Sequence, residues 1–197
     1  MNNMKIGLKE ILDKRFFEEI PNQGFSNSKK VFVLFSTIPG SGYEKIAKKI
    51  AEKYKGLLID KDKARTIIYQ NEKIENTKQP EDILDEYGED LIKKLTALPN
   101  KLIVWMSGAD RRFKTYEKWA EEYGYETFVI NCEIEKDKII ENIESERDRE
   151  TAKWFMNQLD RWEKDHKNYL EQGNVDITIK NPEDLDELFE KLDRILA

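Results

Sequence analysis

Residues 31–42 and the segment that follows them constrain the fold more than any other part of the chain. Residues 31–35 are all apolar, residues 36–42 hold a proline and two glycines, and residues 43–54 place apolar side chains at the spacing of one helix face. This order predicts a buried strand, a tight loop and a helix. Glycines let such a loop close around an anion, toward which the amides of the first helical turn point. The sequence thus predicts a phosphate-binding loop.

The same stretch resembles the P-loop kinases, especially the small kinases related to polynucleotide kinase and zeta toxin. Pro39-Gly40-Ser41-Gly42 matches their PGSG loop, and residues 47–54 resemble the helix that follows it. The resemblance covers most of residues 30–196. It implies a P-loop NTPase or kinase-like fold with a phosphate or nucleotide site at the loop.

The loop motif G-x-x-x-x-G-K-[ST] is nevertheless broken at three positions. Thr37 replaces the first glycine, Tyr43 replaces the lysine that binds phosphate, and Glu44 replaces the hydroxyl residue that binds Mg²⁺. Phosphoryl transfer depends on charge neutralisation by that lysine, by Mg²⁺ and by arginines. The resemblance therefore implies a kinase scaffold without kinase activity of normal size, and we expect neither a metal nor a cofactor.

Length and composition narrow the class of protein. The 197 residues suit one α/β domain spanning 1–197. Charged residues make up 38% of the chain with a net charge of -6, so a broad basic groove for nucleic acid is not expected. Cys132 is the single cysteine, which excludes an internal disulfide and a Cys-rich zinc site. No apolar run approaches about 18 residues, so we expect no membrane span and a cytoplasmic location.

The rest of the chain alternates between predicted helices and strands. A helix over 4–20 precedes the first strand, and further strands are predicted at 56–59, 102–106, 126–132 and 175–179. Further helices are predicted at 62–69, 80–98, 110–124, 135–149, 151–171 and 182–196. Strands separated by helices pair in parallel, so we expect a three-layer α/β sandwich with a mostly parallel five-stranded sheet. A ligand would then bind beyond the carboxyl ends of the strands.

Two further residues take a role from the resemblance. Asp62 and Arg65 match the D-x-x-R that follows the second strand in the family, where the aspartate accepts the proton of the attacking hydroxyl. An aspartate at this position also suits a helix N-cap, with the arginine on the surface.

The third strand and the region that follows it supply other candidates. Trp105 stands where the family usually has an acidic residue near the metal; it cannot bind Mg²⁺ and is equally suited to the core. Ser107 ends this strand, and Arg111 matches the basic residues that follow it. The resemblance implies that region 135–165 is a lid that carries spaced arginines. Asn142 and Glu146 stand where two of these arginines are expected, while Arg147 and Arg149 remain.

Two catalytic hypotheses use the residues that replace the kinase chemistry. Glu44 as a base, Tyr43 as a donor and Trp105 as an aromatic wall could bind a small, partly aromatic molecule and abstract a proton from it. Cys132 and His166 could instead cleave activated esters as a nucleophile and a base. A buried structural cysteine and a surface histidine are the plain alternative to the second hypothesis.

Other functions remain open from the sequence alone. The loop residues Thr37, Gly40, Ser41 and Gly42 could still bind phosphate or sulfate as part of a nucleotide-binding relic. A non-catalytic scaffold is the third possibility. Because the changes gather at the phosphate positions of an otherwise complete scaffold, they indicate a replaced site, of natural or engineered origin.

Overall fold

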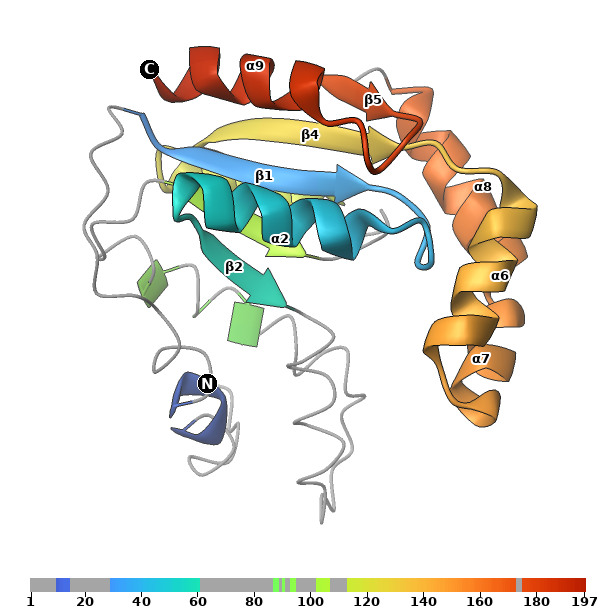
Figure 1. The fold of residues 1–197 in the computed structure, drawn as a ribbon. Coiled ribbons are helices and arrows are strands. Elements are labelled where there is room, and N and C mark those ends of the chain that lie inside the picture. Colours follow the sequence, from blue (N-terminus) through green and yellow to red (C-terminus); the bar gives the residue numbers. More distant parts are fainter. Residues whose placement is uncertain are drawn as a thin grey trace.

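The computed structural model describes residues 10–14, 29–60, 87–88, 90, 93–94, 102–106, 113–172 and 175–197. Within them one five-stranded sheet has the order β2-β3-β1-β4-β5, and each neighbouring pair is parallel. The strands are β1 (Val31–Ser36), β2 (Leu57–Asp60), β3 (Leu102–Met106), β4 (Glu126–Cys132) and β5 (Ile177–Ile179) (Figure 1). The predicted sheet is confirmed.

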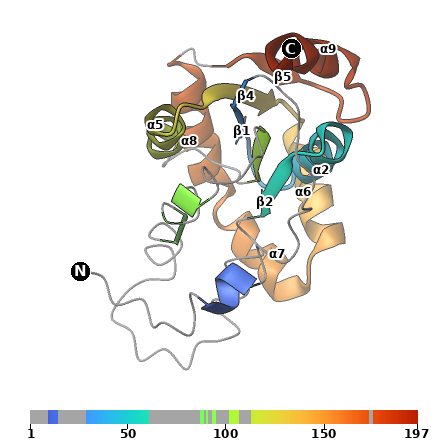
Figure 2. The same ribbon diagram turned by 90° about the vertical axis from the view of Figure 1, so that its left-hand side faces the viewer.

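Helices cover both faces of this sheet. The helices are α2 (Tyr43–Tyr54), α5 (Phe113–Glu122), α6 (Lys136–Glu146), α7 (Arg149–Met156), α8 (Leu159–Leu170) and α9 (Asp186–Leu196), of which α6 and α7 lie at the end of the sheet (Figure 1). Figure 2 shows α2 and α9 on one side of the sheet and α5 and α8 on the other. The three-layer α/β sandwich is therefore confirmed. Residues 10–14 are helical, as are the described residues within 80–98, while the predicted helix 62–69 lies outside the described residues.

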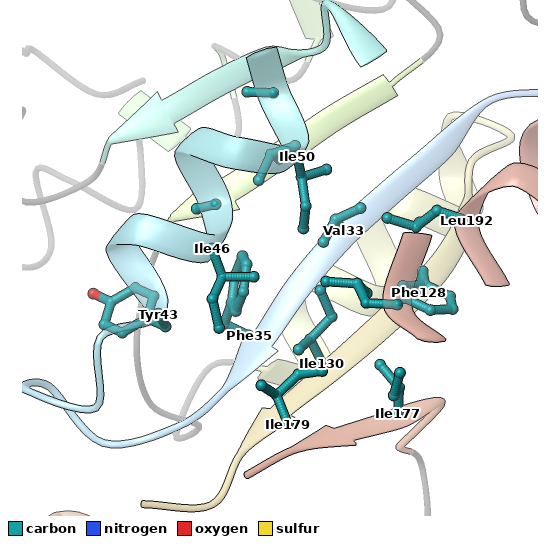
Figure 3. Close-up of a cluster of buried hydrophobic side chains, with 14 of the residues drawn as sticks. Val33, Phe35, Tyr43, Ile46, Ile50, Phe128, Ile130, Ile177, Ile179 and Leu192 are labelled. Carbon is teal, nitrogen blue, oxygen red and sulfur yellow. The ribbon is translucent and has the colours of Figure 1, made fainter. Parts of the chain in front are cut away.

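The central strand β1 supplies core residues to both faces because its side chains alternate. Val31, Val33 and Phe35 join the cluster beneath α2 and α9, of which Figure 3 shows a part. Phe32 and Leu34 join the aromatic cluster beneath α5. All six residues of the strand are buried, and a fully buried large apolar side chain stabilises a fold by about 1.5–3 kcal/mol. The continuous apolar run is thus the signature of a strand covered on both faces.

The predicted helix 151–171 is divided in the structure. The chain turns at residues 157–158, where the Gln158 N–H donates to the Phe155 carbonyl oxygen at 2.9 Å. The turn lets Phe155 of α7 and Trp162 of α8 pack edge to face, with ring centroids 5.3 Å apart. Both rings belong to a third cluster with Ile38 of the loop and with Ile139 and Ile143 of α6. The prediction of one unbroken helix was therefore wrong. The apolar residues of α7 and α8 reach the same cluster from two directions, which requires a turn between them.

The loop after β1 has the backbone that its glycines predict. Gly40 has φ 94° and Gly42 has φ 81°, both in the left-handed region. The Ser41 N–H closes a turn by donating to the Ile38 carbonyl oxygen at 3.1 Å, and α2 begins directly after Gly42.

Alanine substitutions should separate backbone strain from steric contact at these glycines. A Cβ at Gly40 would lie 2.8 Å from Ile143 Cγ1, whereas one at Gly42 would come no closer than 3.6 Å to Pro182 and one at Gly124 (φ 71°) would meet no atom within 4 Å. We expect Gly42→Ala and Gly124→Ala each to lower the free energy of unfolding by about 1–2 kcal/mol, and Gly40→Ala to lower it by more. Urea unfolding measures all three; equal losses would contradict the close approach of α6.

Candidate functional site

Helix α6 lies directly on the phosphate-loop backbone. The Asn142 side-chain amide donates to the Gly40 carbonyl oxygen at 2.8 Å. Ile139 and Ile143 approach Gly40 so closely that a side chain there would overlap them. Figure 1 shows α6, α7 and α8 gathered at the end of the sheet toward which β1 and β4 point. The region predicted to be a lid therefore covers the loop in this structure.

An ion pair joins the lid to the first turn of α2. Arg147 Nη2, at the end of α6, lies 4.0 Å from Glu44 Oε1, with the two side chains 23% and 25% exposed. The guanidinium carbon of Arg147 also lies 3.9 Å from the centre of the Phe155 ring. The positive end of the α2 dipole favours the Glu44 carboxylate. The structure thus brings together Glu44 of α2 and Arg147 of the lid region beside the loop.

The loop hydroxyls bond to the loop and its surroundings. Thr37 Oγ1 lies 2.5 Å from Ser41 Oγ, and Thr37 Oγ1 donates to the Cys132 carbonyl oxygen at 3.5 Å. Both side chains are buried. Thr37 therefore ties the two ends of the loop to each other and to β4.

Tyr43 and Trp105 do not meet. Tyr43 is buried beneath α2 and lies beside Phe35 (Figure 3), and the centroids of the two rings are 5.6 Å apart. Trp105 is buried on the opposite face, 5.1 Å from the ring of Tyr116. The two aromatic residues therefore belong to separate cores, and the trio of Glu44, Tyr43 and Trp105 does not form one pocket.

Cys132 and His166 also lie on opposite faces. Cys132 belongs to the cluster beneath α2 and α9. The pKa of its thiol is raised to about 12, mainly by burial and also by the charge of Glu44, while a hydrogen bond with Thr37 acts to lower it. The His166 ring contacts Asn131, the preceding residue of β4, whose side chain points the other way. The structure does not bring the thiol and the imidazole together.

His166 instead ends a polar row at the carboxyl edge of the sheet. Ser36, Asn131 and Thr178 are aligned across β1, β4 and β5. The Asn131 amide donates to Thr178 Oγ1 at 3.3 Å, and its carbonyl oxygen lies 2.9 Å from His166 Nε2. Since that oxygen accepts, Nε2 carries the proton of the neutral ring. Helix α8 is thereby fixed to the sheet.

Four predicted site residues, Asp62, Arg65, Ser107 and Arg111, lie outside the described residues. Within the described ranges, no group of three or more His, Cys, Asp or Glu side chains could hold a metal ion. None of the described helices is long and apolar enough to cross a membrane.

Two asparagines of the site had no role in the sequence prediction. Asn131 interrupts the apolar residues of β4, and such a polar residue in a buried strand is a usable signal because it requires a hydrogen-bond partner. Asn142 was noted only as a missing arginine. Its bond to Gly40 could not be foreseen, since it joins residues far apart in the sequence.

Comparison with known proteins finds likeness in structure only. No protein-family model and no curated protein matches the chain. A chain of the PezAT chromosomal toxin–antitoxin system of Streptococcus pneumoniae superimposes with a TM-score of 0.53 at 17% identity, over 74% of this chain and 66% of that one, which is just under two thirds.

Two shikimate kinases align with this chain over almost their whole length. The enzyme from Bacteroides thetaiotaomicron gives a TM-score of 0.53 at 13% identity, over 85% of this chain and 98% of that one. The enzyme from Acinetobacter baumannii, in complex with shikimate, gives a TM-score of 0.54 at 12% identity, over 86% of this chain and 95% of that one. At these identities the likeness shows the fold alone, and that fold is P-loop kinase-like.

Burial of Cys132 should protect its thiol from modification. Because the raised pKa keeps the group protonated, and because thiolates are the reactive form, we expect very slow reaction of the native protein with 5,5′-dithiobis(2-nitrobenzoate) at pH 8. Denaturant should restore the rate of an ordinary cysteine. Equal rates with and without denaturant would contradict the placement of Cys132.

The His166 pocket should make stability depend on pH. Burial lowers the pKa of His166 from its usual 6.5, although a hydrogen bond with the Ser36 backbone and the charge of Glu133 act in the opposite direction. The unfolded chain then binds a proton more readily than the folded one, so stability is retained above the usual pKa and falls as the pH drops below it. We expect wild type to lose more free energy of unfolding between pH 7 and 5 than His166→Gln. Identical pH profiles would contradict this.

Proposed function

We propose that the chain is a P-loop kinase-like ligand-binding protein that does not transfer phosphoryl groups, because its own side chains occupy the phosphate site. The observation that carries the proposal is the Glu44–Arg147 contact of 4.0 Å between the first turn of α2 and the lid. In a kinase these two positions serve the metal and the transferring phosphoryl group. Here a carboxylate stands in for the ligand's negative charge and a lid arginine neutralises it.

The charge of Glu44 opposes nucleotide binding. Two like charges about 4 Å apart near a protein surface repel each other by on the order of 4 kcal/mol. The lysine that would offset such repulsion is replaced by Tyr43, whose ring packs against Phe35 in the core. A triphosphate at this loop would therefore meet a negative charge without the usual cation.

The contacts between α6 and the loop support a site that is closed without a nucleotide. The Asn142 bond to the Gly40 carbonyl and the packing of Ile139 and Ile143 need neither phosphate nor metal. A nucleotide would have to displace the Arg147 contact before its phosphates reached the loop. This arrangement favours a binding role over a catalytic one.

A residual phosphate-binding function is the second candidate. It is favoured by the left-handed Gly40 and Gly42, which keep the backbone curvature of a phosphate loop. Proton abstraction and ester cleavage gain no support, because Tyr43, Trp105 and Cys132 lie in cores and because Glu44 is already paired. Replacement of the phosphate site on a complete scaffold, by natural change or by design, fits the same pattern.

Calorimetry with Mg·ATP tests the proposal. We expect the unaltered protein to bind no more tightly than about 1 mM, which corresponds to about 4 kcal/mol. Glu44→Thr should strengthen binding by removing the repelling charge, and adding Tyr43→Lys should strengthen it further if the double variant folds, as its melting temperature will show. Glu44→Gln is the matched neutral control that supplies no metal-binding hydroxyl. Micromolar affinity in the unaltered protein would overturn the proposal in favour of the second candidate.

A further inference from the structure

A cavity of about 620 Å³ lies between α6 and α7, next to the lid arginine. Its lining residues are Glu144, Arg147, Arg149, Ala152, Lys153 and Met156. The volume falls within the range of about 300–1,000 Å³ that small-molecule sites occupy. None of the loop residues lines it, so a molecule held here would not use the phosphate loop.

The walls of this cavity are positively charged. Among the lining residues that the structure describes, Arg147, Arg149 and Lys153 face one carboxylate, Glu144. In the part of the chain that the structure describes, neither Arg149 nor Lys153 forms an ion pair. With Glu44 behind Arg147, the described side chains here are three cations and two carboxylates, which leave one net positive charge among them. That balance suits a monoanion better than a polyphosphate.

Arg147 has unused hydrogen-bonding capacity. A guanidinium offers five N–H donors, yet the 4.0 Å to Glu44 is too long for a hydrogen bond. Its Nε is buried and has no hydrogen-bond partner. A planar carboxylate could accept two parallel hydrogen bonds from such a group. The guanidinium thus keeps donors for a bidentate acceptor that the described residues do not supply.

The rest of the lining is apolar. Ala152 is buried, Met156 is half-buried, and the Phe155 ring lies beneath the Arg147 guanidinium. A methionine adapts its shape to a ligand and makes favourable contacts with aromatic rings. A carboxylate held by Arg147 would therefore have an apolar surface beside it for a small ring or a short alkyl group.

We propose that the cavity between α6 and α7 binds a small organic monocarboxylate with a compact apolar group. The carboxylate pairs with the Arg147 guanidinium, Arg149 and Lys153 supply further positive charge, and the apolar group contacts Ala152 and Met156. This inference rests on the proposed function in one respect, that the protein binds a ligand without processing a nucleotide. It names the site and the class of that ligand.

Titration of the full chain with phenylacetate, followed by amide NMR, tests this site. We expect saturable changes in the amide chemical shifts of residues 147–156, with a dissociation constant of about 1 mM for a ligand of this size. Phenethyl alcohol, the neutral analogue, should shift these amides far less. Arg149→Gln and Lys153→Gln should each weaken phenylacetate binding several-fold, and together by about tenfold or more. Both side chains are exposed, so the fold should tolerate the changes.

Lys138→Gln is the matched control, since Lys138 is an exposed cation of α6 outside the cavity and pairs with Glu141. It should leave the affinity unchanged. The inference is overturned if phenylacetate gives no saturable shift, if the alcohol binds equally well, or if Lys138→Gln weakens binding as much as the cavity variants. Phenyl phosphate binding much more tightly than phenylacetate would overturn the carboxylate assignment. Mg·ATP binding at the loop bears on the proposed function alone, so the two failures are distinguishable.

Discussion

The rest of the site depends on the absence of a side chain at Gly40. Only a hydrogen atom fits between this residue and Ile143, and this closeness lets Asn142 reach the Gly40 carbonyl oxygen. The same approach carries Arg147 to Glu44 and places Ile38 in the lid cluster. Close packing transmits such constraints because protein interiors leave few voids. Gly40 thus shapes the loop and also provides the surface on which α6 packs.

The charged residues beside the loop are the second feature that bears on its function. A P-loop lysine and a bound metal offset the charge of phosphate, whereas in this chain Tyr43 and Glu44 directly follow Gly42. Glu44 and Arg147 offset each other's charge beside the loop. Because the pair is partly exposed, its contribution to stability is small. Under the proposed function, its importance lies in the ligands that the Glu44 carboxylate repels.

The fold followed from the sequence more readily than the site did. Apolar runs at 31–35 and 102–106 and the helical spacing of 43–54 determine strands and a helix locally, so their bounds were predicted well. Sequence also marked Glu44 and Arg147 separately. It could not show that Tyr43 and Trp105 lie on opposite faces, because both residues are aromatic and both stand near the loop end of their elements. Nor could it find the turn at 157–158, which exists to satisfy a cluster assembled from three distant segments.

That turn also decides what each helix rests on. Helix α8 contacts β1 and is fixed to the sheet through His166, whereas α7 contacts α6, which rests on the loop. The Phe155 and Trp162 rings join the two helices across the turn, with their centroids 5.3 Å apart. The cluster at the turn therefore links the loop, through α6 and α7, to the sheet, through α8.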